Sequence, residues 1–295
     1  MKKFELTSES IVNIFGKKLF RIKALIEFGN VKEGELGGFV EKEENLSHEG
    51  NAWVYENARV FSDARVYGNA KVLDNAWVCE NAWVSGDAWV SGDAEVCGNA
   101  KVYENAEVFE NARVCGNAEV YGDAEVYGDA KVYGDAKVCE NAWVYGDAEV
   151  YGDAKVYGDA KVYGDAKVYG DAWVCDDARV FDNAWVCDDA WVYGDAKVYG
   201  NAEVCGDAKV CGDARVCGDA RVYGNADYAT VKGFGTEYRT TTFFKCKDGI
   251  LRVRCGCFYG DLEEFRNQVK NTRKGKIAEE YLMIADLMEK HFKEE

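Results

Sequence analysis

The sequence contains no proline, two histidines and no long apolar run. Without proline, every backbone N–H can join a hydrogen-bonded ladder, which suits a chain made largely of strands. The scarcity of histidine leaves few candidates for a general base. No stretch is long and apolar enough to span a membrane, and residues 1–6 lack the apolar core of a signal peptide. We therefore expect a cytoplasmic protein without a membrane partner.

A six-residue phrase, Asp/Asn-Ala-x-Val-x-x, runs without insertion through residues 51–226. Alanine falls at every sixth position from Ala52 to Ala226 and valine at every sixth from Val54 to Val222, giving 30 alanines and 29 valines. Within a phrase, Ala and Val are two residues apart, so on a strand both point to the same face. The residues on either side of Val point outward. Pairs such as Gly-Asp and Glu-Asn between phrases favour turns. The period predicts a β-solenoid lined by Ala and Val, with four residues of strand and two of corner per side.

We favour three sides, hence 18 residues, per coil, so that the 29 phrases form about ten coils. The outward residues do not decide this number. Cys79, Cys97 and Cys115 recur at steps of 18, whereas Cys175 and Cys187 are separated by 12. A two-sided coil of 12 residues therefore stays open as an alternative.

Two features carry a resemblance to known proteins. An aliphatic residue followed four positions later by a small one, as in Val54 and Ala58, resembles the left-handed parallel β-helix of hexapeptide-repeat proteins. The stretch 30–47, which contains Gly37-Gly-Phe-Val40, resembles the lead-in of YdcK-like hexapeptide proteins, a group similar to bacterial acyltransferases in fold but without an assigned substrate. The resemblance implies a left-handed helix.

The chain divides into three predicted parts. Residues 1–50 form an N-terminal β cap that includes a hairpin over residues 11–22, and residues 51–226 form the β-helix. Residues 227–295 form a small α+β module, in which Asp248-Gly249 is the turn of a hairpin and two apolar stripes predict two helices. Asp261 and Glu264 make a capping box at the first helix. The module is similar to tails of phage-associated repeat proteins.

The whole net charge of −17 lies on the repeats. Residues 51–226 carry 15 basic and 32 acidic side chains, whereas the two flanking parts are nearly balanced. Such a surface repels nucleic acid and attracts basic proteins or cations. An acidic decoy that occupies a nucleic-acid-binding protein is therefore one alternative function.

All eight tryptophans occupy the outward slot before Val, and most residues in the slot after Val are Tyr, Phe or Cys. We expect these aromatic side chains to stack on neighbours one coil away. Aromatic columns of this extent also predict a surface for self-association or for a protein partner. The candidate interaction residues are Trp173, Trp191, Trp185, Tyr127, Tyr145 and Tyr163.

The cysteines and the corner carboxylates are the candidate metal ligands. Nine cysteines follow Val and are expected to remain thiols in a reducing compartment, as small apolar substitutes for Tyr or Phe. Cys246, Cys255 and Cys257 lack a clear fourth ligand, and strand alternation places Cys255 and Cys257 together in the core. A calcium site stays open for a corner column of aspartates: Asp135, Asp153, Asp171, Asp189 and Asp207. We assign no metal and no cofactor.

Hexapeptide acyltransferases need a histidine base and loops that form a substrate cleft. His48 and His291 lie outside the repeats, and no loop interrupts the phrases, so we assign no catalytic residue. The sequence favours a non-enzymatic structural or protein-interaction solenoid. Its partner is expected to be a second copy or another protein, including a basic one, and not nucleic acid itself. The alternatives are the acidic decoy and a CoA-dependent acyltransferase with His48 as base.

Overall fold

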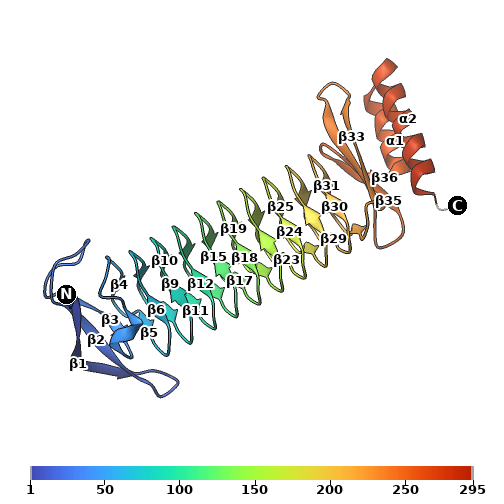
Figure 1. Ribbon diagram of the computed structural model, residues 1–295. Coiled ribbons are helices and arrows are strands. Elements are labelled where there is room, and N and C mark those ends of the chain that lie inside the picture. Colours follow the sequence, from blue (N-terminus) through green and yellow to red (C-terminus); the bar gives the residue numbers. More distant parts are fainter. Residues whose placement is uncertain (1, 294–295) are drawn as a thin grey trace. The chain divides into compact units, whose positions relative to one another are not determined.

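The computed structural model describes residues 2–293 and divides into two compact units, Met1–Asp159 and Ala160–Glu295 (Figure 1). Both units contain parallel β-solenoid, about ten turns in total, and the second adds an antiparallel sheet and two helices. The predicted boundaries at residues 50/51 and 226/227 stay predictions.

The first unit begins with an antiparallel hairpin of β1 (Phe4–Val12) and β2 (Lys18–Ala24), which confirms the predicted hairpin. Strand β3 (Leu36–Val40) pairs antiparallel with β2 and parallel with β5 (Arg59–Val60). A short 3-10 helix, η1 (Glu43–Asn45), follows β3. The N-terminal segment thus adds strands to the edge of one solenoid sheet, as a cap does.

The repeats form very short strands, each consisting of Val and the residue before it. Strand β4 is Trp53–Val54 and each later strand starts six residues on, so that the first unit ends with β21 (Lys155–Val156). The second unit continues from β22 (Lys161–Val162) to β32 (Arg221–Val222). The prediction of four-residue strands is wrong. The Ala N–H is used to close the corner, as where Ala58 donates to the Tyr55 carbonyl oxygen at 3.0 Å.

Each strand pairs in parallel with the strand 18 residues away, as Val60 with Val78 and Val162 with Val180. This register confirms three sides per coil, and the two-sided alternative is wrong. The Ala and Val side chains of the repeats from Ala52 to Val222 are 0–1% exposed, which confirms the predicted interior, whereas Ala226, after the last repeat strand, is exposed. Each coil is closed by the ladder to the next, for example Lys131 N–H to Ala148 O at 2.9 Å. The left-handed sense stays a prediction.

The corners link each coil to the next through side chains. The first corner residue has a positive φ, usually as glycine but sometimes as an acid, such as Glu110 at 62°. The Glu110 carboxylate accepts the Gly128 N–H at 2.8 Å, one coil further on. At the second corner position, Asn111 donates its amide to the Asp129 carboxylate at 3.0 Å. The corners therefore form hydrogen-bond ladders of their own, which run from coil to coil beside the ladders of the strands.

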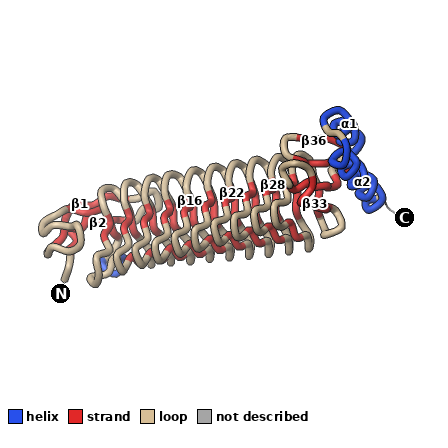
Figure 2. Tube along the Cα trace, turned by 90° about the horizontal axis from the view of Figure 1, so that it is seen from above, coloured by secondary structure: helices blue, strands red, loops and turns tan. Residues whose placement is uncertain are grey.

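The C-terminal part of the second unit is a four-stranded antiparallel sheet followed by two helices (Figure 2). The predicted hairpin around Asp248-Gly249 and the capping box of Asp261 and Glu264 are confirmed, whereas the two outer strands were not predicted. One face of the sheet packs on the apolar sides of the helices, with Phe265 in the shared core. The elements are β33 (Tyr228–Phe234), β34 (Arg239–Lys245), β35 (Leu251–Cys255), β36 (Phe258–Asp261), α1 (Leu262–Thr272) and α2 (Gly275–Phe292).

Candidate interaction surface

The structure brings two of the predicted interaction residues together in the second unit. Trp173 on β24 (Trp173–Val174) stacks on Trp191 of β27 (Trp191–Val192), with ring centroids 4.6 Å apart and planes inclined by 7°. Trp185 lies on β26 (Trp185–Val186), in another sheet, where it meets the ring of Tyr169 edge-on at 6.4 Å. The three tryptophans therefore do not form one patch.

The predicted tyrosines stand in stacked columns. In the first unit, Tyr127 stacks on Tyr145 with centroids 4.9 Å apart and planes parallel within 1°. In the second unit, Tyr163 stacks on Phe181, and Phe181 on Tyr199, both at 4.9 Å. The prediction that aromatic residues stack one coil apart is confirmed. Their part in binding a partner stays a prediction.

Exposed charges surround the stacked tryptophans. Lys209, one coil beyond Trp191, places its ammonium 4.9 Å from the centroid of that ring. The corner carboxylates Asp171 and Asp189, which precede the two tryptophans by two residues, are exposed. Aromatic rings that accept a cation from this chain can also accept one from a partner. We name Trp173, Trp191, Asp171 and Asp189 the tryptophan face.

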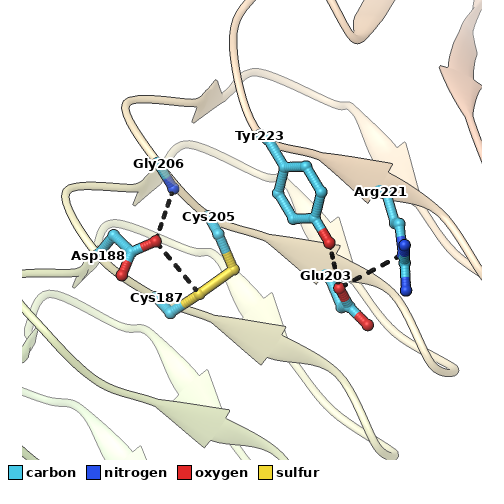
Figure 3. Close-up of a disulfide and its surroundings, with 7 residues drawn as sticks. All are labelled: Cys187, Asp188, Glu203, Cys205, Gly206, Arg221 and Tyr223. Atoms are coloured by element: carbon cyan, nitrogen blue, oxygen red, sulfur yellow. Dashed lines mark hydrogen bonds and ion pairs between the residues drawn. A yellow bond between two sulfur atoms is a disulfide. The ribbon is translucent and has the colours of Figure 1, made fainter.

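A disulfide joins Cys187 and Cys205 (Figure 3). The expectation that all nine cysteines in the slot after Val remain thiols is therefore wrong for this pair. Both occupy the slot after Val in successive coils, which brings their Cα atoms to 4.6 Å. Asp188 lies 3.9 Å from the Cys187 sulfur and accepts the Gly206 N–H at 3.2 Å. Cys187, Asp188 and Cys205 cluster closely, but the two sulfurs are used in the bond and offer no thiolate to a metal.

Cys79 and Cys246 are buried thiols. Burial raises the pKa of Cys79 to about 12 and that of Cys246 to about 11, which makes both poor nucleophiles. The prediction that Cys255 and Cys257 lie together on one buried face of a strand is wrong. Strand β35 ends at Cys255, and Gly256 turns the chain with a φ of 60°. Cys257 is exposed.

His48, the alternative catalytic base, is held in the N-terminal cap. Its ring stacks on Phe4 with centroids 4.4 Å apart, and its Nδ1 accepts the Lys3 backbone N–H at 3.2 Å. Its Nε2 lies 3.6 Å from the Glu43 carboxylate. These contacts give the imidazole a place in the packing of the cap.

The calcium alternative at the corner aspartates stays untested.

A pocket of about 740 Å³ in the second unit, lined by four cations, was not predicted from the sequence. They are Arg215, Lys232, Arg239 and Arg254. Arg215 ends a series of basic residues at steps of 18 in the slot before Val, which is the signal that the sequence offered. It could be recognised only once the length of the coil was known.

Comparison with known families gives a match at the end of the repeats. The model of the YdcK β-solenoid repeat family matches residues 214–226, which are the end of the repeats. No curated protein matches the chain. The matched repeat and the observed coils agree on the class of the fold, a β-solenoid. Within the described residues, the helices are too short or too polar to cross a membrane.

Proposed function

We propose that the protein is a non-enzymatic β-solenoid that binds a protein partner through the tryptophan face. The observation that carries the proposal is the stacked pair Trp173 and Trp191, half-buried beside exposed carboxylates. Tryptophans that are held rigidly and flanked by acids suit Lys or Arg side chains of a partner, through cation–π contacts and ion pairs. The partner is therefore a basic segment of a protein.

A second copy of the chain is one source of such a segment, since residues 270–276 carry four basic side chains and no acidic one. Light scattering over a range of protein concentrations tests self-association against the monomer mass of 32.8 kDa. We expect the mass to rise with concentration, and Trp173→Ser with Trp191→Ser to abolish the rise. The matched control is Trp89→Ser, an exposed tryptophan of the same slot in the first unit.

A partner other than a second copy is tested with an arginine-rich peptide and the intrinsic tryptophan fluorescence of the full chain. Saturable quenching that is lost in the Trp173→Ser, Trp191→Ser variant supports the face as the binding site. If the wild type neither self-associates nor binds the peptide, the proposal fails. It also fails if Trp89→Ser reduces both signals equally.

Two observations favour this proposal over the alternatives. His48 is packed against Phe4 in the cap, whereas an acyltransferase needs its histidine free to reach an acceptor. A DNA-like decoy needs a continuous acidic surface, but Arg179, Lys197 and Arg215 make one face of the second unit basic.

A further inference from the structure

The second unit carries a column of cations on one face of its solenoid. Lys161, Arg179, Lys197 and Arg215 occupy the slot before Val on β22, β25 (Arg179–Val180), β28 (Lys197–Val198) and β31 (Arg215–Val216), each paired with the next. Like charges placed opposite each other on neighbouring strands destabilise a sheet. Consistent with this, burial and then the charges of Arg215 and Arg179 lower the pKa of Lys197. The cations of the column therefore oppose one another's charge, and an anion beside them would relieve this repulsion.

The column ends at the pocket of about 740 Å³, where the last coils meet the C-terminal sheet. Arg215 comes from the solenoid, Lys232 from β33, Arg239 from β34 and Arg254 from β35. The sheet is fixed against the coil where the Arg215 N–H donates to the Thr242 hydroxyl oxygen at 2.9 Å. Four cations from four elements therefore converge on one cavity.

The protein neutralises this charge incompletely. Among the described residues, Asp213 is the one carboxylate that lines the pocket, and it pairs with Lys232. Arg239 lies 3.9 Å from the exposed Glu237, a contact too long and too solvated to hold it firmly. Four cations and one carboxylate leave an excess of three positive charges.

Two of the four cations keep their hydrogen-bond donors for a ligand. Within the described part of the chain, no carboxylate pairs with the guanidinium of Arg215 or Arg254. The Nε of Arg254 is buried and lacks a hydrogen-bond partner in the protein, while its guanidinium lies 6.0 Å from the Tyr199 ring centroid. A buried donor without a partner is unfavourable, and an anion in the pocket would satisfy it.

We propose that this pocket binds an oligophosphate, a chain of two or more linked phosphate groups. Arg215 and Arg254 donate paired N–H bonds to phosphate oxygens, since the planar guanidinium matches that geometry. Lys232 and Arg239 neutralise the remaining charge. The volume exceeds that of a single phosphate and falls within the usual range for small-molecule sites. The cation column beside the pocket raises the local concentration of the anion.

Calorimetric titration of the full chain with phosphate, pyrophosphate, tripolyphosphate and ATP, without divalent cations, tests the site. We expect affinity to increase with the number of linked phosphates and to fall as NaCl rises. Arg215→Gln and Arg254→Gln are each expected to weaken tripolyphosphate binding about tenfold, the loss of one charge-assisted pair. ATP binding more tightly than tripolyphosphate identifies a nucleotide as the source of the phosphates, and equal affinities identify the inorganic chain.

The matched control is Arg113→Gln, an arginine of the same slot in the first unit that pairs with Glu95 at 3.6 Å. Its affinity for tripolyphosphate is expected to equal that of the wild type. Circular dichroism checks that each variant is folded. Should Arg254→Gln disturb the sheet, Arg215→Gln on the solenoid and Arg239→Gln on the exposed rim carry the test.

Cys257 reports where the ligand binds, because it lines the pocket and is exposed. Tripolyphosphate is expected to slow maleimide labelling of Cys257, followed by peptide mass spectrometry, in the wild type but not in Arg215→Gln. Absence of saturable binding by any of the four anions overturns the proposal. So does binding that Arg215→Gln and Arg254→Gln leave intact, or that Arg113→Gln weakens equally.

Discussion

Two columns in the same outward slot, one in each unit, arrange their charges in opposite ways. In the first unit, Lys101, Glu119 and Lys137 are successive members of one column, and Glu119 pairs with both lysines, at 3.0 and 3.4 Å. In the second unit, three cations stand at the same spacing, Arg179, Lys197 and Arg215, without a carboxylate among them. Both columns rest on fully buried valines.

The difference shows that the fold requires the buried valines but accepts either arrangement of charges in the outward slot. Burial alone would raise the pKa of Glu119, but hydrogen bonds from the two lysines outweigh it and leave the pKa below its ordinary value. Lys197 also has a lowered pKa, but for a base this means that the charged form is disfavoured. The alternating column stabilises its own charges, whereas in the cationic column Arg215 and Arg179 oppose the charge of Lys197, which Asp195 offsets in part.

Replacing a valine beneath either column is expected to have the largest effect, because the two columns share one kind of interior. Val120→Asp in the first unit and Val198→Asp in the second bury a carboxyl group without a partner, at a cost of about 4 kcal/mol. Hydrogen exchange is expected to show opening of the coils around each site. Protection that is unchanged in either variant would contradict the shared interior.

Substitutions of corner glycines are expected to have the second largest effect on stability. Gly128 and Gly200 both have a φ of about 73°, and a Cβ on either would lie 2.9 Å from the backbone nitrogen of the next coil. Gly128→Ala and Gly200→Ala should therefore each lower the free energy of unfolding by about 2 kcal/mol, measured by urea denaturation. Clearly unequal losses would show that the corners of the two units are not equivalent.

Making the first column resemble the second should destabilise it. Glu119→Lys replaces two attractions by two repulsions and is expected to lower the free energy of unfolding by about 1 kcal/mol. The loss should shrink at high salt, because the side chains are partly solvated. Glu119→Gln, which removes the attraction alone, is the control and should lie between the variant and the wild type.

The reverse change should stabilise the second column. Lys197→Glu places a carboxylate between Arg179 and Arg215 and is expected to raise the free energy of unfolding by about 0.5 kcal/mol. The same change should weaken tripolyphosphate binding several-fold, since it reverses a charge in the column that leads to the pocket. A variant that gains stability and keeps full affinity would separate the column from the pocket.

The smallest effect concerns proton binding by Lys197. Its pKa lies below the ordinary 10.5, and Arg179→Gln should raise it because a neighbouring cation is removed. The unfolded chain holds this proton more tightly, so the contribution of Lys197 to stability rises as the pH approaches 10.5 from below. NMR titration of the lysine Nζ resonances measures the shift, and an unchanged pKa in Arg179→Gln would refute the coupling.

The interior could be predicted from sequence because it depends on local rules. Ala and Val at a fixed period determine an inward face, and Asp248-Gly249 determines a hairpin without reference to the rest of the chain. Strand length could not be inferred in this way. Whether the Ala58 N–H joins the ladder or closes the corner depends on the conformation of the corner itself.

The candidate sites were harder to predict because they depend on which residues become neighbours. Trp173 and Trp191 were recognised by their common slot, but Cys187 and Cys205 look like ordinary members of that pattern until the register places them in adjacent coils. The pocket was harder still to predict from the sequence. Arg254 and Arg215 line the same cavity only because the C-terminal sheet packs on the last coils. Neither contact has a local signature.

The step of 18 residues also governs which changes in length the repeats tolerate. Removing one whole coil within a unit leaves every later side chain on its original side, so the columns shorten but keep their identity. Removing a single hexapeptide keeps the Ala and Val interior intact but moves every later phrase to the neighbouring side of the coil. Tryptophans then occupy positions in a column that previously held lysines. Duplication and loss in multiples of three phrases therefore preserve the side-chain columns in a way that single-phrase changes do not.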